Sequence, residues 1–299
     1  MPSMRSTSSS TRVCARWRDG TPVARPSPHL VIGLTLVGGL LAAAVLSLAW
    51  APYPVEAMAV GERLAPPSPA HWLGTDHFGR DVLSLILAGS RTAVLVGLVA
   101  VGLGMAAGVA LGLLAAAAGG RIDEAVMRAS DTVFAFPAVV SAVLVTALLG
   151  PGAVNAVLAI AIFNVPVFAR VARAAALQVW ARDYARAALA LGKSPLAVTR
   201  DHVLPNIAGV LIVQAAVQFG LAILAEAALS YLGIGAQPPE PSWGRMLSDA
   251  QTYMFTDPGL ALYPGLAISA AVLGCNLLGD GLRDALDPRL GRVVRRFAT

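Results

Sequence analysis

The residues Gly192, Lys193 and Ser194 are of the types that end a phosphate-binding loop. In such a loop, backbone N–H groups and a lysine hold the phosphates of a nucleotide, and a further glycine stands five residues before the second one. Position 187 is alanine instead. The flanking residues 183–191 are mostly Ala and Leu, which favour a helix and not the strand-to-loop context of that motif. The sequence therefore predicts that this segment does not bind ATP.

No other group of polar residues has the spacing of a catalytic or metal site. Ser, His and Asp occur, but not in a nucleophile elbow, and the HExxH zinc motif is absent. His71, Asp76, His77 and Asp81 are close in sequence, yet they match no tetrahedral ligand set. One cysteine lies in a polar tail and the other in an apolar segment, so no disulfide is indicated. We expect a protein that is not an enzyme and holds no cofactor or metal of its own.

The composition indicates that a bilayer is the solvent for most of the chain. Hydrophobic residues make up 57% of the 299 and charged residues 13%, and the mean hydropathy is +0.69. A soluble domain is usually about 25% charged. The 29 glycines suit helices that pack closely in a membrane. Three of them, Gly104, Gly108 and Gly112, are four residues apart and would let a neighbouring helix approach one helix face.

Uncharged runs mark the helices that cross the membrane, because about 20 helical residues span the hydrocarbon core. The run at 132–169 is too long for one crossing, and Leu-Gly-Pro-Gly at 149–152 divides it. The run at 30–51 exceeds the core of a signal peptide, so we interpret it as an uncleaved first helix. The six predicted spans are 30–51, 92–120, 132–149, 153–169, 202–232 and 258–279.

The basic residues predict the orientation through the positive-inside rule. With a cytoplasmic N-terminus, the inside segments are a disordered basic tail at 1–29, loops at 121–131 and 170–201, and a C-terminal tail at 282–299. These segments hold 5, 2, 6 and 5 Lys or Arg, which is 18 of the 22 in the chain. We therefore expect both termini in the cytoplasm, residues 52–91 outside, and a core of five further spans over 92–281. This distribution accounts for the net charge of +5 without nucleic-acid binding.

The cytoplasmic loop at 170–206 contains a predicted helical hairpin. Gly192, with Pro195 three residues later, is an ordinary helix stop. Ser194 can cap a second helix that begins at Pro195, where proline is tolerated, and that ends before Leu204-Pro205. Physics alone leaves two roles equally open for the loop: its arginines meet lipid phosphates, or another protein docks on it.

The same loop resembles the EAA loop of ABC importer permeases in its small residues, Gly192 and Leu204-Pro205. Further blocks resemble the C-type permease of the dipeptide, oligopeptide and nickel importers, in order and at the expected spacing, over about 71–290. They are His71–Ser84, with its LGTD and GRD motifs, Gly119–Glu124, Met127–Asp131, Glu226–Gly233, Pro241–Leu247 and Asn276–Pro288. A single block would be weak evidence, but the series is specific.

The resemblance implies an all-α, polytopic membrane protein with six transmembrane helices and the type I ABC importer permease (MetI-like) fold. It implies import of dipeptides or oligopeptides across the bacterial inner membrane, with nickel or glutathione as alternative cargoes. The implied partners are a homologous second permease in a heterodimer, two cytoplasmic ABC ATPases that bind the ATP and Mg, and an extracytoplasmic substrate-binding protein.

The resemblance also assigns residues to two partner surfaces. The ATPase-coupling loop would use Tyr184, Arg186, Ala187, Ala188, Gly192, Lys193, Ser194, His202, Leu204, Pro205 and Asn206. The binding-protein side would include Trp72, Gly74, Thr75, Asp76, Gly79, Arg80, Asp81 and Trp243. The chain departs from the family at Arg186, where the loop usually has Glu. This departure leaves open which ATPase residue meets position 186, and an acidic residue there would compensate for the change.

Acidic residues at the predicted spans are costly in a membrane and are usually paired. Asp131 and Asp280 lie near the cytoplasmic ends, where an arginine such as Arg170 can pair with them, so a structural role is favoured. Glu226 lies deeper, and two roles stay open for it: a structural one, or a place in the substrate pathway or gate.

A stand-alone secondary transporter is the alternative from another class. It would need inverted repeats and charge pairs near the bilayer midplane. The sequence has few charges there and no symmetry between its halves, and a membrane enzyme would lack a catalytic constellation. The importer subunit is therefore the favoured interpretation.

Overall fold

The computed structural model of the chain describes residues 27–286, so most of the predicted tails at 1–29 and 282–299 lies outside it. The described part is mostly helical, and its only bridge of strand type joins Thr75 and Asp81. The α-helices are α2 (Pro28–Ala49), α3 (Val82–Ala118), α4 (Gly120–Phe134), α5 (Ala138–Leu149), α6 (Ala153–Trp180), α7 (Asp183–Ala190), α8 (Pro195–Val198), α9 (Leu204–Tyr231), α10 (Trp243–Ala250) and α11 (Gly259–Leu286). Short 3₁₀-helices cover Val60–Glu62 and Gln251–Tyr253, and a π-helix covers Thr199–Val203.

Five of these helices are long and apolar enough to cross a bilayer, namely α2, α3, α6, the continuous helix Pro195–Tyr231 that contains α9, and α11. The all-α membrane fold is thus confirmed, but six single-helix spans are not. The predicted span that is missing is the third, at 132–149, where α5 has only 12 residues and rises about 18 Å. The hydrocarbon core of a bilayer is about 30 Å thick.

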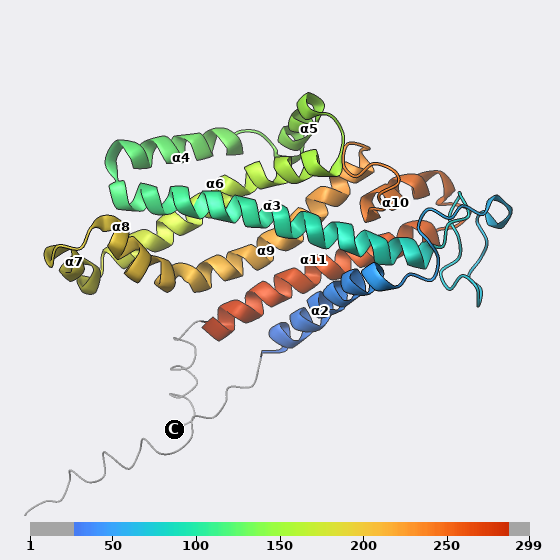
Figure 1. Ribbon diagram of the computed structural model, residues 1–299, viewed down its shortest axis with the longest axis horizontal. Helices are drawn as coiled ribbons and strands as arrows, with labels where there is room; N and C mark the ends of the chain where they lie inside the picture. The colour runs from blue at the N-terminus through green and yellow to red at the C-terminus, as the bar shows by residue number, and fades with distance from the viewer. Residues whose placement is uncertain (1–26, 287–299) are drawn as a thin grey trace, which may run out of the picture.

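The region before α5 also differs from the sequence prediction. Residues 121–131 were expected as a loop and 132–149 as one helix, whereas α4 already begins at Gly120 and Pro137 separates it from α5. Proline lacks an N–H group and disfavours a helical residue before it, which explains the break. α4 lies back along α3 and α6 (Figure 1). Because α3 and α6 run in the same direction, α4 and α5 together return the chain to the other end (Figure 1).

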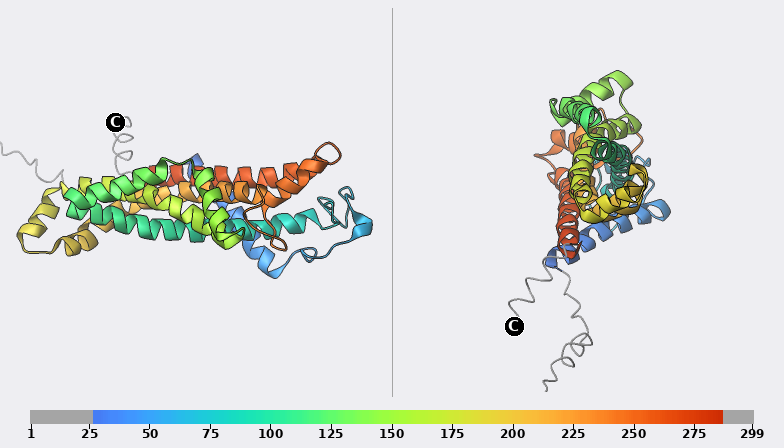
Figure 2. Two further views of the ribbon diagram at one scale, coloured as in Figure 1. Left: turned by 90° about the horizontal axis from the view of Figure 1, so that it is seen from above. Right: turned by 90° about the vertical axis from the view of Figure 1, so that its left-hand side faces the viewer.

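The long helices form an elongated bundle with two different ends (Figures 1 and 2). α7 and α8 protrude at one end, while α10 and the segment between α2 and α3 lie at the opposite end. A Cβ on Gly281 would lie 2.5 Å from Leu30 Cα, so the end of α11 meets the start of α2. A Cβ on Gly209 would lie 3.5 Å from Leu286 Cδ1, so the same end of α11 also meets the start of α9.

The glycines of α3 bring this helix into close contact with α6. A Cβ on Gly108 would lie 2.7 Å from Phe168 Cβ, and one on Gly112 would lie 2.9 Å from Ala172 Cβ. Gly104 is pressed in the same way against Asn164. α3 and α6 therefore approach each other through this glycine face, as the spacing of the three residues predicts.

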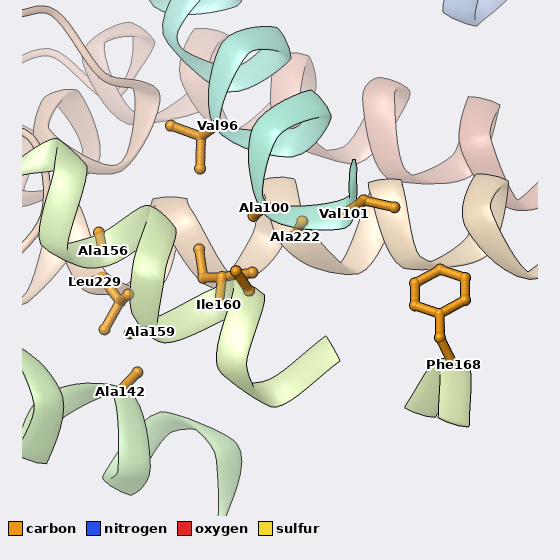
Figure 3. Packing of buried hydrophobic residues seen from close by; sticks show 11 residues of the cluster. Val96, Ala100, Val101, Ala142, Ala156, Ala159, Ile160, Phe168, Ala222 and Leu229 are labelled. Carbon is orange, nitrogen blue, oxygen red and sulfur yellow. The ribbon is translucent and has the colours of Figure 1, made fainter. Parts of the chain in front are cut away.

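A buried apolar cluster joins α3 and α6 to α5 and α9 (Figure 3). Val96 and Ala100 of α3, Ile160 of α6 and Ala222 of α9 pack together in it. Ala142 joins this cluster from α5 (Figure 3). Small side chains dominate, so the helices are held by close approach and dispersion rather than by large interlocking residues.

Candidate functional site

The eleven residues predicted for the coupling loop all lie at the end of the bundle where α7 and α8 protrude (Figure 2). The hairpin has a small apolar core of its own, in which Ala185 and Ala188 of α7 pack on Val198 of α8 and on Trp180, the last residue of α6. This core holds α7 and α8 together as one unit at the end of α6.

The turn between the two helices has the predicted conformation and cap. Gly192 adopts φ +87°, a conformation that glycine reaches without a Cβ penalty. Its N–H donates to Leu189 O at 2.9 Å, and the N–H of Lys193 donates to Ala188 O at 3.1 Å. The hydroxyl of Ser194 accepts a hydrogen bond from the N–H of Ala197 at 3.3 Å and so caps α8.

The second half of the hairpin differs from the prediction. α8 covers only four residues, passes into the π-helix, and continues into α9 without the expected break before Leu204. Pro205 does not interrupt the path, because it follows the π-helix Thr199–Val203, and a local change to π-type hydrogen bonding accommodates a proline inside a helix. The Nζ of Lys193 lies 3.0 Å from a carboxylate oxygen of Asp201, and the amide of Asn206 donates to His202 O at 2.6 Å.

The outer surface of the hairpin combines apolar and basic groups. Leu191 and Leu196 are 87% and 78% exposed, and Tyr184 and Ala187 are also on the surface. Within residues 27–286, no carboxylate lies within ion-pair distance of the exposed Arg186. An exposed apolar patch beside a free cation is typical of a surface that a partner covers.

Ion pairs fasten α4 to the part of α6 that leads to the hairpin. The guanidinium of Arg173 donates to both carboxylate oxygens of Asp123, and that of Arg170 donates to Asp131. Arg170 also lies over the ring of Phe134, 4.4 Å from its centroid. The structural role favoured for Asp131 is therefore the one observed.

At the opposite end, the segment between α2 and α3 is held by buried polar contacts. His71 Nδ1 lies 3.0 Å from Asp81 and Nε2 lies 3.2 Å from Glu62. The hydrogen bond that His71 donates to the Asp81 carboxylate raises the pKa of His71 above its ordinary value, with a smaller contribution from Glu62. Asp81 also caps α3 by accepting from the N–H of Ser84 at 2.8 Å, and the hydroxyl of Thr75 donates to Glu62 O.

The LGTD and GRD motifs form a tight turn on this segment. One carboxylate oxygen of Asp76 accepts from the N–H of Phe78 at 2.8 Å and from that of Arg80 at 2.9 Å. The other oxygen accepts from the Arg80 guanidinium at 2.7 Å. Gly74 and Gly79 have φ +77° and +76° and lie against backbone carbonyls, so their lack of a Cβ is required. These residues shape the segment, and Trp72 is exposed beside them.

Trp243 and Glu226, by contrast, are buried. The indole of Trp243 is 4% exposed, packs on Gly89 and donates to Ile86 O at 3.0 Å, so it presents no surface to a docked protein. One oxygen of Glu226 accepts from the hydroxyl of Ser230 at 2.7 Å and from that of Ser242 at 2.8 Å. Ser242 is the N-cap of α10, so its hydrogen bond to Glu226 joins α9 to α10.

Two polar residues within the spans were not singled out in the sequence. Asn164 of α6 and Gln218 of α9 are buried and joined by a hydrogen bond of 2.6 Å. Both are isolated amides within uncharged runs, and this pattern could have identified them, because polar side chains inside membranes usually form hydrogen bonds between helices. The pairing of these two residues, 54 positions apart, has no sequence signature.

The chain is similar over most of its length to known transport proteins. Residues 108–292 match the model of the family described as binding-protein-dependent transport system inner membrane component. The chain is 39% identical to the dipeptide transport system permease protein DppC of Alkalihalophilus pseudofirmus, over 92% of this chain and 90% of that protein. It is 42% identical to the glutathione transport system permease protein GsiD of Pectobacterium atrosepticum, over 86% and 87% of the two chains. It is 40% identical to the probable D,D-dipeptide transport system permease protein DdpC of Escherichia coli, over 89% of each.

These similarities cover the bundle and the hairpin together, and the relatives are transport subunits rather than enzymes. ATP hydrolysis in such systems belongs to separate ATPase subunits, in agreement with the missing phosphate-binding glycine at position 187. The chain therefore belongs to the binding-protein-dependent transport system inner membrane component family, as a multi-pass inner-membrane permease subunit of an ABC importer.

Proposed function

We propose that this chain is the C-type permease of a peptide importer and that residues 184–206 receive the motion of a cytoplasmic ATPase. The observation that carries this proposal is the hairpin itself. It has its own core and caps, exposes Leu191 and Leu196, and is joined directly to two membrane-spanning helices. A loop that only met lipid phosphates would not need a fixed turn or outward-facing leucines.

The proposed orientation places the hairpin in the cytoplasm. Nine of the 13 Lys and Arg within residues 27–286 lie on the segments that meet at this end. They are Arg121, Arg128, Arg170, Arg173, Arg182, Arg186, Lys193, Arg200 and Arg283. The positive-inside rule supports this assignment, with both termini on the same side.

The proposed assembly is a heterodimer with a homologous permease, two ATPases and an extracytoplasmic binding protein. ATP binding and hydrolysis would alternate the pathway between outward and inward access, because each state has a different affinity for the hairpins. Arg186 would meet an acidic residue of its ATPase. The binding protein would dock near Trp72 and the Asp76–Asp81 turn.

The proposed cargo is a short peptide. The three relatives are named for dipeptide, D,D-dipeptide and glutathione transport, and glutathione is itself a peptide. Glutathione is therefore the first alternative cargo and nickel the second. Purifying the complex and identifying the ligand held by its binding protein would distinguish them.

The test of the coupling role compares two glycines of like geometry at opposite ends of the bundle. Gly192 and Gly233 have φ +87° and +79°, and each donates its N–H back to its preceding helix. Proline fixes φ near −65° and removes that donor, so it breaks either turn. Gly192→Pro should insert in the membrane but lose ATPase co-purification and peptide uptake. Gly233→Pro should retain the ATPase.

Two results would contradict the proposal. One is normal peptide-dependent ATP hydrolysis by the Gly192→Pro complex. The other is uptake by the purified chain alone, driven by an ion gradient, which would support a secondary transporter.

A further inference from the structure

A cavity of about 260 Å³ lies between α5, α6 and α9. Its walls are apolar and include Ala142, Ile160, Leu221 and Leu229, three of which are seen in Figure 3. Among the described residues that line it, only Asn164 and Gln218 are polar. A small number of polar groups in an apolar wall is the usual composition of a site for an organic ligand.

The two amides are buried but incompletely satisfied. Asn164 is 4% exposed and Gln218 is 6% exposed, and Gln218 Nε2 donates to Asn164 Oδ1 at 2.6 Å. The remaining amide nitrogen of Asn164 has no hydrogen-bond partner within the described part of the chain. An unbonded buried donor is unfavourable, so this nitrogen is the group that a ligand would satisfy.

This conclusion does not depend on how the two amides are turned. If both are rotated by 180°, Asn164 Nδ2 donates to Gln218 Oε1, and the nitrogen of Gln218 becomes the spare donor. In either arrangement one hydrogen bond joins α6 to α9, and one NH₂ group of the pair has no partner among the described residues. The pair therefore calls for a hydrogen-bond acceptor on the ligand.

The volume and position of the cavity indicate which part of a ligand it can hold. Its volume is far above the roughly 10–15 Å³ that one water needs, and water would require two to four polar partners. The volume is below the roughly 300–1,000 Å³ of a complete ligand pocket, so it holds a part of the ligand. Asn164 and Gln218 lie 11 and 14 residues into helices of 28, near the middle of each span. Transporters commonly place substrate sites at that depth.

We propose that the Asn164–Gln218 pair donates a hydrogen bond to a backbone carbonyl or terminal carboxylate of the transported peptide, while the apolar walls hold one apolar side chain. This site rests on the proposed peptide import and names a contact within it. It sets a preference for peptides with a small apolar residue next to an accessible acceptor, beyond the selection made by the binding protein.

The decisive variant removes both amides together, as Asn164→Leu with Gln218→Met. Exchanging two bonded polar partners for apolar groups of similar shape is nearly neutral for folding, so the complex should assemble and melt like wild type. Loss of the donor should lower peptide uptake about two- to tenfold, the usual range for one hydrogen bond. Wild type should also transport a peptide faster than its thioamide analogue, a weaker acceptor, and the variant should lose that preference. Because the same binding protein delivers both peptides to wild type and to the variant, its own selectivity affects the two complexes equally.

A cross-linking experiment identifies what occupies the cavity. A photo-reactive residue at Leu221, which lines the cavity, should capture labelled peptide during turnover. The control is Ile212, on the same helix and equally exposed at 49%, which should not. Capture of the second permease alone at position 221 would overturn the proposal, because that side of the cavity would then be filled by protein.

The possible results distinguish failure of the proposed peptide import from failure of the proposed Asn164–Gln218 site. Failure of the wild-type complex to import any peptide would contradict the proposed function. Normal import by wild type, together with unchanged uptake and thioamide preference in the double variant, would overturn the Asn164–Gln218 site and leave the importer intact.

Discussion

Gly108 gives the sharpest test of the packing between α3 and α6. A Cβ at this position would lie 2.4 Å from Val165 O, 2.7 Å from Phe168 Cβ and 3.0 Å from Ala169 N, whereas ordinary contacts begin at 3.4 Å. The two helices would have to separate by about 1 Å to admit it, and overpacking of this kind costs roughly 1–3 kcal/mol. Gly108→Ala should therefore destabilise the protein although alanine is the better helix former.

Gly102 is the matched control, because it lies on the same helix and a Cβ added there would meet nothing within 4 Å. Gly102→Ala should be neutral or stabilising by up to about 1 kcal/mol, from helix propensity. The propensity gain is common to both variants, so they should differ by the overpacking cost, about 1–3 kcal/mol in the free energy of unfolding. In a background with Cys14 replaced by Ser, the buried thiol of Cys275 is the only one left, and its reaction with a fluorescent maleimide reports thermal unfolding in detergent.

The expected result is a lower melting temperature for Gly108→Ala than for Gly102→Ala. A difference of this size shifts the melting temperature by several degrees, at roughly 2–4 °C per kcal/mol for a large domain. Equal melting temperatures, or a more stable Gly108→Ala, would refute close contact between the two helices at this glycine.

Three further predictions follow from the site. Gly192→Ala places a Cβ at φ +87° and should cost about 1–2 kcal/mol locally, which amide hydrogen exchange should detect as faster exchange in the hairpin while the bundle is unchanged. Because contact with carboxylates raises the folded-state pKa of His71, its stabilising contribution should be complete below about pH 6.5 and decline as pH rises through the raised value; the melting temperatures of wild type and His71→Gln should therefore converge at alkaline pH. Asp123→Asn weakens the pair with Arg173 and should cost about 1 kcal/mol, whereas Glu124→Gln at a more exposed pair should cost close to nothing, as compared by denaturant unfolding.

Local features of the fold were predictable from the sequence. The charge-free runs indicate the long helices, and the order Gly192, Ser194, Pro195 predicts the turn and the cap, because these preferences act within a few residues. The Gly104–Gly112 spacing predicts a close helix contact, although it does not say which helix makes it.

Features that depend on distant residues were not predictable in the same way. Residues 121–131 resemble a charged loop because their partners, Arg170 and Arg173, lie 39 and 50 positions along the chain from Asp131 and Asp123. Trp243 resembles an exposed loop aromatic because Gly89, which makes room for its ring, belongs to another helix. In each case tertiary packing decides what the local pattern leaves open.

The direct connection of the hairpin to α6 and α9 has a mechanical consequence. Trp180 and Asn164 are 16 residues apart on one arm, about 24 Å, and Leu204 and Gln218 are 14 residues apart on the other, about 21 Å. Two helical arms of nearly equal length thus run from the hairpin to the two ends of a single 2.6 Å hydrogen bond. A shift of α6 along α9 by the rise of one residue, about 1.5 Å, would lengthen this hydrogen bond beyond the range of donor–acceptor distances. A force applied at the hairpin that shifts α6 relative to α9 would therefore break the hydrogen bond between Asn164 and Gln218.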